Sequence, residues 1–104
     1  MLGDTVNTKL RRALARIRKG WVQGKQASDA QGGEVGWNDP SAVRWCLAAS
    51  VDFDYQSELR LLRTLRLPDH SPTHTLVAWN EAPERTREQV IALLENAIAD
   101  AETV

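Results

Sequence analysis

Three side chains of this sequence occur in the order used by a papain-like cysteine hydrolase: Cys46, His74 and Asn80. Such an enzyme needs a thiolate with a lowered pKa, an adjacent imidazole to take its proton, and an amide that orients the imidazole. Cys46 suits this chemistry poorly, because a helix is expected to begin at Asp39 and the thiol would lie about two turns inside it, beyond the help of the helix dipole. It would also lie on the apolar face, where a thiol is inert. We therefore expect a buried core cysteine, no catalytic residue, and a protein that is not an enzyme.

Zinc binding is the second function that the residue types suggest. The side chains that could ligate the metal are Cys46, Asp69, His70 and His74. Two histidines four positions apart suit ligation on a helix, but Pro68 and Pro72 disfavour a helix there, and the chain has no CxxC pair. We expect no metal and no cofactor, with His70 exposed on a loop and His74 in a turn.

Acidic and glycine-rich segments offer no better site. Acids ahead of a helix and in its first turn are favoured by the helix dipole, which accounts for Glu81, Glu84 and Glu88. The glycines of segment 32–36 lack the strand, the Lys and the Ser or Thr that make a phosphate-binding loop.

Tryptophan dominates the aromatic composition, with four Trp against one Phe and one Tyr. Each indole offers a large apolar surface and one N–H that needs a partner. Two of them open similar segments, WNDP at residues 37–40 and WNEAP at residues 79–83. We expect Trp21, Trp37 and Trp79 to be wedges that anchor loops.

The bulk composition indicates one domain over residues 1–104, since 104 residues with 42% hydrophobic content suffice for one modest core. No apolar run approaches the roughly 20 residues that a membrane span needs. The first residues lack the apolar centre of a signal peptide. One cysteine excludes a disulfide within the chain, and we expect a cytoplasmic protein.

Charge is unevenly distributed along the chain. Residues 1–25 carry seven Lys or Arg against one Asp, whereas the remainder carries six Arg against thirteen acids. The basic segment either pairs with acids inside the fold or attracts an anionic partner. In the second case nucleic acid would bind through residues 9–19, with phosphates contacted by Lys9, Arg12, Arg16 and Lys19.

Apolar spacing predicts four main helices. The first runs from about residue 6 to Gly20, and the second begins with Asp39 as N-cap and Pro40 at the first helical position. The third spans about 54–66, and the fourth begins at Thr86, whose pairing with Gln89 matches a capping box.

Two long connectors, residues 22–38 and 69–85, join these helices. Within the second, residues 75–79 fit a strand or a helical turn, and we favour the turn because a lone strand would lack a partner. The sequence therefore predicts an all-α fold, a compact bundle of four main helices with two long connectors.

Several motifs together resemble a family of small bacterial and phage proteins with no assigned function. They are GWxQG at Gly20–Gly24, WC at Trp45–Cys46, and the segment from Trp79 through Asn80, Glu81, Pro83, Arg85 and Thr86 to Val90. The resemblance spans nearly the whole chain. It implies an intact one-domain fold and adds no active site.

These observations favour a small, soluble, non-catalytic module that binds another protein in an accessory or inhibitory role. Trp and Arg dominate interface hot spots, and the sequence offers Trp37 and the basic face as candidate binding residues. Nucleic-acid binding through residues 9–19 is the alternative, and cysteine hydrolysis by Cys46 is the third hypothesis. The sequence leaves a homodimer open and indicates no membrane partner.

Overall fold

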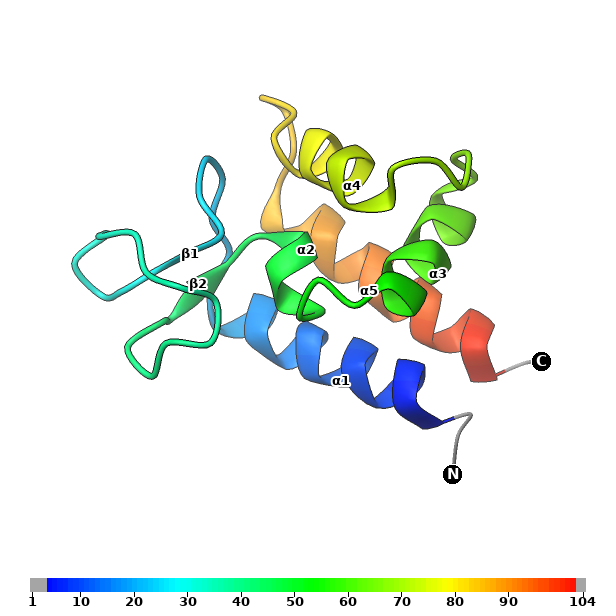
Figure 1. The fold of residues 1–104 in the computed structure, drawn as a ribbon, viewed down its shortest axis with the longest axis horizontal. Helices are drawn as coiled ribbons and strands as arrows, with labels where there is room; N and C mark the ends of the chain where they lie inside the picture. Colours follow the sequence, from blue (N-terminus) through cyan, green and yellow to red (C-terminus); the bar gives the residue numbers. More distant parts are fainter. Residues whose placement is uncertain (1–3, 103–104) are drawn as a thin grey trace.

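The structure, a computed structural model, describes residues 4–102. The elements follow in the order α1 (Asp4–Lys19), β1 (Ala27–Ser28), β2 (Arg44–Trp45), α2 (Leu47–Ser50), α3 (Tyr55–Leu65), α4 (Pro72–Asn80) and α5 (Arg87–Glu102) (Figure 1). The fold is mainly helical, as predicted, but the prediction of an all-α protein is wrong in that a two-stranded antiparallel sheet is present.

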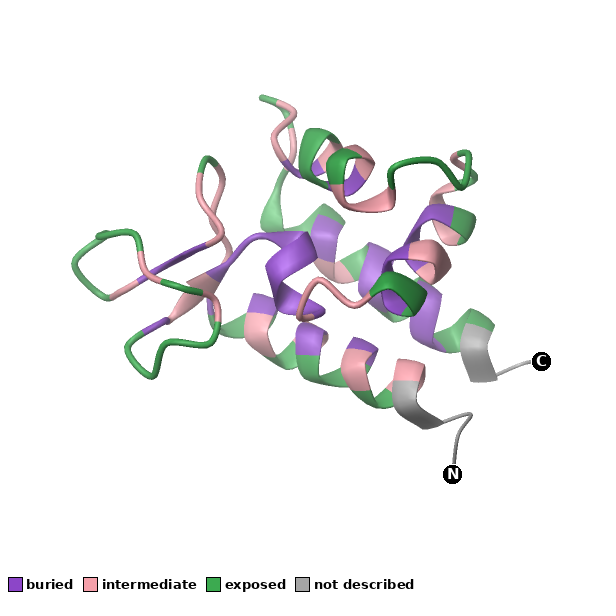
Figure 2. Ribbon diagram, in the orientation of Figure 1, coloured by how far each residue is buried: buried purple, intermediate pink, exposed green. Residues whose placement is uncertain are grey.

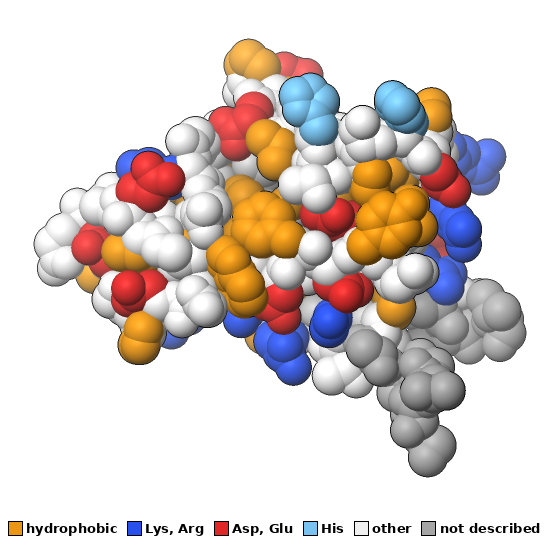
Figure 3. All heavy atoms as spheres, viewed as in Figure 1, with side chains coloured by type: hydrophobic (Ala, Val, Ile, Leu, Met, Phe, Trp, Pro, Cys, Tyr) orange, Lys and Arg blue, Asp and Glu red, His pale blue; other side chains and the backbone are white. Residues whose placement is uncertain are grey.

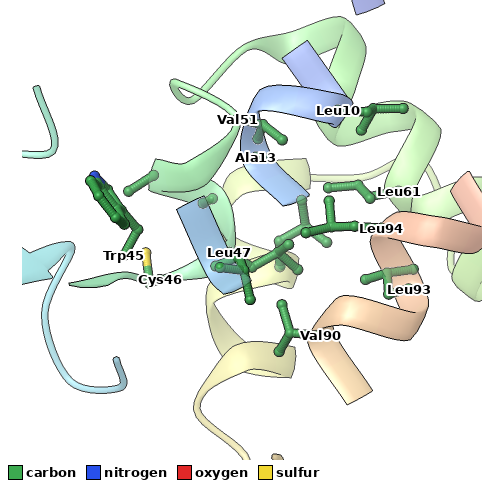
Figure 4. Packing of buried hydrophobic residues seen from close by; sticks show 14 of the residues in the cluster. Leu10, Ala13, Trp45, Cys46, Leu47, Val51, Leu61, Val90, Leu93 and Leu94 are labelled. Atoms are coloured by element: carbon green, nitrogen blue, oxygen red, sulfur yellow. The ribbon is translucent and has the colours of Figure 1, made fainter. Parts of the chain in front are cut away.

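The helices pack around a short central one. α1 lies along α5, and α3 packs against both α5 and α4 (Figure 1). α2 contacts α1 and α4, and all four of its residues are buried, as Figure 2 shows. Figure 4 shows the aliphatic side chains that meet there, including Leu10, Leu47, Leu61 and Leu94. Burial of this cluster is the main favourable contribution to folding.

The helix at the N-terminus has the predicted apolar stripe. Leu10, Ala13 and Ile17 are fully buried at successive turns of α1. Gly20 ends the helix by a close approach to β2 and not by an unusual φ, because a Cβ at this position would collide with the carbonyl oxygen of Val43. The sequence therefore located this helix end correctly but for a different reason.

Two further helix starts are confirmed. Asp54 caps α3, since its carboxylate accepts hydrogen bonds from the N–H and the hydroxyl of Ser57 at 3.0 and 2.8 Å. At α5 the capping box forms in both directions: Gln89 N–H donates to Thr86 Oγ1 at 3.2 Å, and Thr86 N–H donates to Gln89 Oε1 at 3.0 Å.

The predicted helix starting at Asp39 is wrong. The Asp39 carboxylate accepts from the N–H and hydroxyl of Ser41, which closes a local turn. The backbone then extends, and the N–H groups of Val43, Trp45 and Cys46 donate to carbonyls of residues 20–28. Helix α2 begins only after Cys46, which is its N-cap. Pairing with a distant segment therefore outweighs the helical spacing.

That distant segment belongs to the first connector, residues 22–38, which supplies β1. Ala27 pairs with Trp45, and Ser28 pairs with Arg44. The sheet and its turns project from one end of the helical part (Figure 1). The connector is thus a structural element, although it shows no apolar periodicity.

Residues 75–79 are helical, as favoured, and belong to α4. The helix starts earlier than expected because Pro72 occupies its first turn, where a missing N–H costs nothing. The expectation that the prolines keep His74 out of a helix is therefore wrong, and His74 lies in α4. Within residues 4–102, no helix has the length and apolar character required to cross a membrane.

Glu58 is a buried carboxyl group between α3 and α4, with 1% of its surface exposed. Its two oxygens lie 2.7 and 2.8 Å from the hydroxyl of Thr73, which can donate to only one of them at a time. Burial raises the pKa of Glu58, the bond from Thr73 offsets part of this increase, and the carboxylate of Asp54 adds to it.

We predict that Glu58→Gln changes how stability depends on pH. A carboxyl group whose pKa is raised by folding contributes stability below its unfolded pKa and loses it as pH rises through the folded pKa. Glutamine has no proton to lose, so the free energy of unfolding of the variant, relative to the natural chain, should be higher at about pH 7 than at about pH 4. Urea unfolding at both pH values measures this. An equal difference at both would contradict the prediction.

Candidate functional site

A pocket of about 350 Å³ opens where the first connector, the start of α2 and α4 meet. We call it the Cys46 pocket. Its lining residues are Gly24, Lys25, Gln26, Cys46, Phe53, Val77 and Glu81. Val77 is one of the exposed large hydrophobic residues of the protein, at 37%. Figure 3 shows hydrophobic side chains gathered on the face of the molecule seen in Figure 1, near α2 and α4.

One wall of the pocket is fixed by the buried amide of Asn80. This side chain is fully buried, and its Oδ1 accepts from the indole N–H of Trp21 at 2.7 Å and from Leu47 N–H at 3.1 Å. Its Nδ2 donates to the carbonyl of Val22 at 3.2 Å and to Glu81 Oε2 at 3.0 Å. All four bonding sites of the amide are therefore used to join the chain after α1, the start of α2 and the end of α4.

Neighbouring bonds hold residues 21–26, which we call the strap, against the end of α4. Gln23 donates both of its amide hydrogens, to the carbonyls of Asn80 at 2.8 Å and Ala82 at 2.9 Å. Gly24 N–H donates to Glu81 Oε1 at 2.7 Å, with φ of +83°, a conformation that favours glycine. The Glu81 carboxylate therefore serves to position the strap.

Another part of the lining depends on two consecutive residues in left-handed backbone conformations. Asp52 has φ of 59° and Phe53 has φ of 53°, which costs of order 1 kcal/mol for each non-glycine residue. Asp52 is held there by Arg16 Nη1 at 2.6 Å and Arg12 Nη1 at 3.1 Å. This turn brings the ring of Phe53 into the lining, so the two strained residues lie at the pocket.

The sulfur of Cys46 is at the edge of the core, as Figure 4 shows, beside Trp45. The residue is 5% exposed. Burial raises the pKa of its thiol above the ordinary value, although N–H groups of Ala49 and Ala48 partly oppose this. The thiol is therefore neutral at pH 7 and acts as a small apolar surface.

The three residues in hydrolase order do not form a catalytic group around this sulfur. Asn80 has no bonding capacity left for an imidazole. His74 is exposed on α4, and neither histidine lines the Cys46 pocket. Among the described residues, no three His, Cys, Asp or Glu side chains are grouped so that they could hold a metal ion.

The basic residues of α1 largely face acids of the fold. Lys9 Nζ is 2.9 Å from Asp54, and Arg12 and Arg16 share Asp52. Arg18 pairs with Glu95 of α5 at 2.8 Å, and Lys19 is exposed. Burial alone would raise the pKa of Asp54, but hydrogen bonds from Lys9 and Ser57 outweigh it and hold that pKa below the ordinary value.

Arg16 also joins two of the tryptophans. Its guanidinium carbon lies 6.0 Å from the ring centre of Trp37 and 5.7 Å from that of Trp45. Trp37 meets the ring of Phe53 edge to face at 6.3 Å. Arg16 and Trp37, which the sequence offered as candidate binding residues, are thus part of the framework behind the pocket.

Sequence reasoning did not find this pocket, because its lining comes from three separate segments. The available signals were the Gly residue of the GWxQG motif and the acid after Trp79-Asn80. Along the sequence both indicate chain turns or helix starts, whereas in the fold Glu81 and Gly24 bond to each other.

The fold and the site define a small, mainly helical protein with an apolar pocket beside its cysteine. The chain belongs to a family of unknown function, DUF6197, whose model matches residues 1–100. No curated protein and no solved structure matches it.

We predict that Asn80→Ala lowers the free energy of unfolding by about 3 kcal/mol, because buried partners of the amide lose their bonds. Thermal or urea unfolding measures the change. The matched control is Asn96→Ala on the exposed surface of α5, which should stay within about 0.5 kcal/mol of the natural chain. Equal effects of the two changes would show that the buried amide has no special role.

We predict slow alkylation of Cys46 by iodoacetamide near neutral pH. The raised thiol pKa leaves little thiolate, and burial restricts access, so the folded chain should react much more slowly than the same chain in urea. The rate should increase as pH approaches the raised pKa. Mass spectrometry over time provides the measurement, and equally fast reaction of folded and unfolded chains would contradict it.

Proposed function

We propose that this protein is a small non-catalytic module that binds another protein by accepting an apolar side chain of that partner in the Cys46 pocket. The observation that carries the proposal is the chemistry of the lining: the ring of Phe53, the side chain of Val77 and a neutral thiol. Interfaces concentrate their binding energy where an anchor side chain fills such a pocket.

The dimensions and rigidity of the pocket support this function. A volume of about 350 Å³ is at the small end of ligand sites, of the scale of one large side chain. Its walls are held by the bonds of Asn80 and Glu81 before any partner arrives. Binding to a preformed pocket avoids much of the entropy cost of ordering loops.

The ion pairs of α1 favour binding at the Cys46 pocket over binding through the basic helix. Nucleic-acid binding through residues 9–19 remains the second proposal, but Lys9, Arg12 and Arg16 would have to release the carboxylates they contact in order to bind phosphates. Cysteine hydrolysis ranks third, because it needs a thiolate and the pKa of Cys46 is raised.

The setting that we infer is the cytoplasm of a bacterial or phage-infected cell, in an accessory or inhibitory role. It is supported by the single cysteine and by the resemblance of the sequence motifs to those of small bacterial and phage proteins. A second copy of the chain is a further partner to consider, and a change of mass with concentration would reveal it.

We predict that Val77→Glu abolishes partner binding and that Ala78→Glu does not. Both residues are exposed neighbours on α4, but only Val77 lines the pocket, so the two variants add the same charge at matched positions. The partner is first captured from an extract of the native host by the immobilised natural chain and identified. The affinity of the purified partner for each variant is then measured at low and at high salt. An apolar interface responds little to salt, whereas phosphate binding weakens steeply. Equal affinity of both variants, or loss of binding at high salt, would contradict the proposal.

A further inference from the structure

A second hollow, of about 360 Å³, lies between α3, α4 and α5, and we call it the Arg85 pocket. Trp79 contributes to it from α4, two residues after Val77, which places the two hollows on different faces of that helix. It is therefore a separate site, and ligand binding there does not depend on the proposed function. The sequence motif that contains Trp79 and Arg85 is not explained by the Cys46 pocket.

The guanidinium of Arg85 is held in one orientation in this pocket. Its carbon lies 3.8 Å from the centre of the Trp79 ring, a close stacking contact. Its Nε donates to the carbonyl oxygen of Trp79 at 2.9 Å, and Nη1 lies 3.5 Å from Gln89 Oε1. A planar group fixed in this way has lost its side-chain freedom before a ligand binds.

The same guanidinium lacks an anionic partner. Arg12, Arg16 and Arg18 each pair with a carboxylate, but Arg85 makes no ion pair with any residue that the structure describes. No acid lines the pocket either. With Nε bonded to the backbone and one N–H of Nη1 directed to Gln89, the N–H groups of Nη2 and the second N–H of Nη1 remain to donate. A charge-assisted hydrogen bond from a guanidinium to a carboxylate oxygen is stronger than a bond between neutral groups.

The other lining residues indicate which chemical groups such an anion should have besides its negative charge. Gln89 and Asn96 add neutral polar side chains, while Leu65 and Leu93 add apolar surface beside Trp79. We propose that the Arg85 pocket binds a small organic carboxylate with an apolar or aromatic body. The carboxylate accepts from Arg85, and the body lies against the leucines and the indole.

The test uses the full chain labelled with ¹⁵N and phenylacetate as the probe. Phenylacetate should shift the Arg85 Nε–H and Trp79 indole signals saturably, with a millimolar Kd, while the Trp21 indole signal stays in place. Phenylacetamide has the same body without the charge and should bind at least about tenfold more weakly. Inorganic phosphate has charge without the body and should also bind more weakly. Equal binding of either compound would overturn the assignment.

Three variants locate the carboxylate. Arg85→Gln should weaken phenylacetate binding by about tenfold or more, and Arg87→Gln, at an exposed arginine outside the pocket, should leave it unchanged. Asn96→Asp keeps Arg85 and adds a competing negative charge to the lining, so binding should weaken severalfold. The Trp21 indole signal reports folding. If Arg85→Gln shifts that signal, the substitution has disturbed the fold, and the test of the proposal then rests on Asn96→Asp alone. Unchanged affinity in Asn96→Asp, or equal losses in the two arginine variants, would overturn the proposal.

Discussion

The hydrogen-bonded amide of Asn80 is the constraint on which the rest of this structure depends. A buried amide with unmet bonding groups is costly, so its four bonds fix the relative positions of the segments that supply them. Those segments follow α1, begin α2 and end α4. The strap then has one position, and Glu81 secures its Gly24. The Cys46 pocket is the space left between these fixed parts, which is why its walls exist without a ligand.

A second constraint comes from the charges of α1. Several cations of this basic helix are turned toward the fold, and Asp52 and Asp54 pair with them at the link between α2 and α3. The pair of Arg16 with Asp52 also holds the strained turn that presents Phe53. Electrostatics and backbone strain are therefore coupled at one side of the pocket. Arg85 differs, because stacking and a carbonyl position it without an acid.

Local signals predicted the parts of the fold that depend on local interactions. The apolar stripe of α1, the start of α3 near residue 54 and the capping box of α5 all form as expected, since each involves residues within a few turns of one another. The segment from Asp39 to Cys46 has similar helical signals but forms a turn and a strand. Its backbone groups pair with residues 20–28, and spacing within one segment carries no information about a partner some twenty residues away.

The sequence by itself determined the mainly helical class, the helices α1, α3 and α5, and the burial of the lone cysteine. These follow from apolar periodicity and capping residues, which act over short distances along the chain. Only the tertiary structure decided that Cys46 starts α2 beside a pocket, that Asn80 is a structural amide, and that the first connector supplies a strand. Each of these depends on contacts between residues far apart in sequence, where burial and hydrogen-bond geometry, and not residue type, fix the role of a side chain.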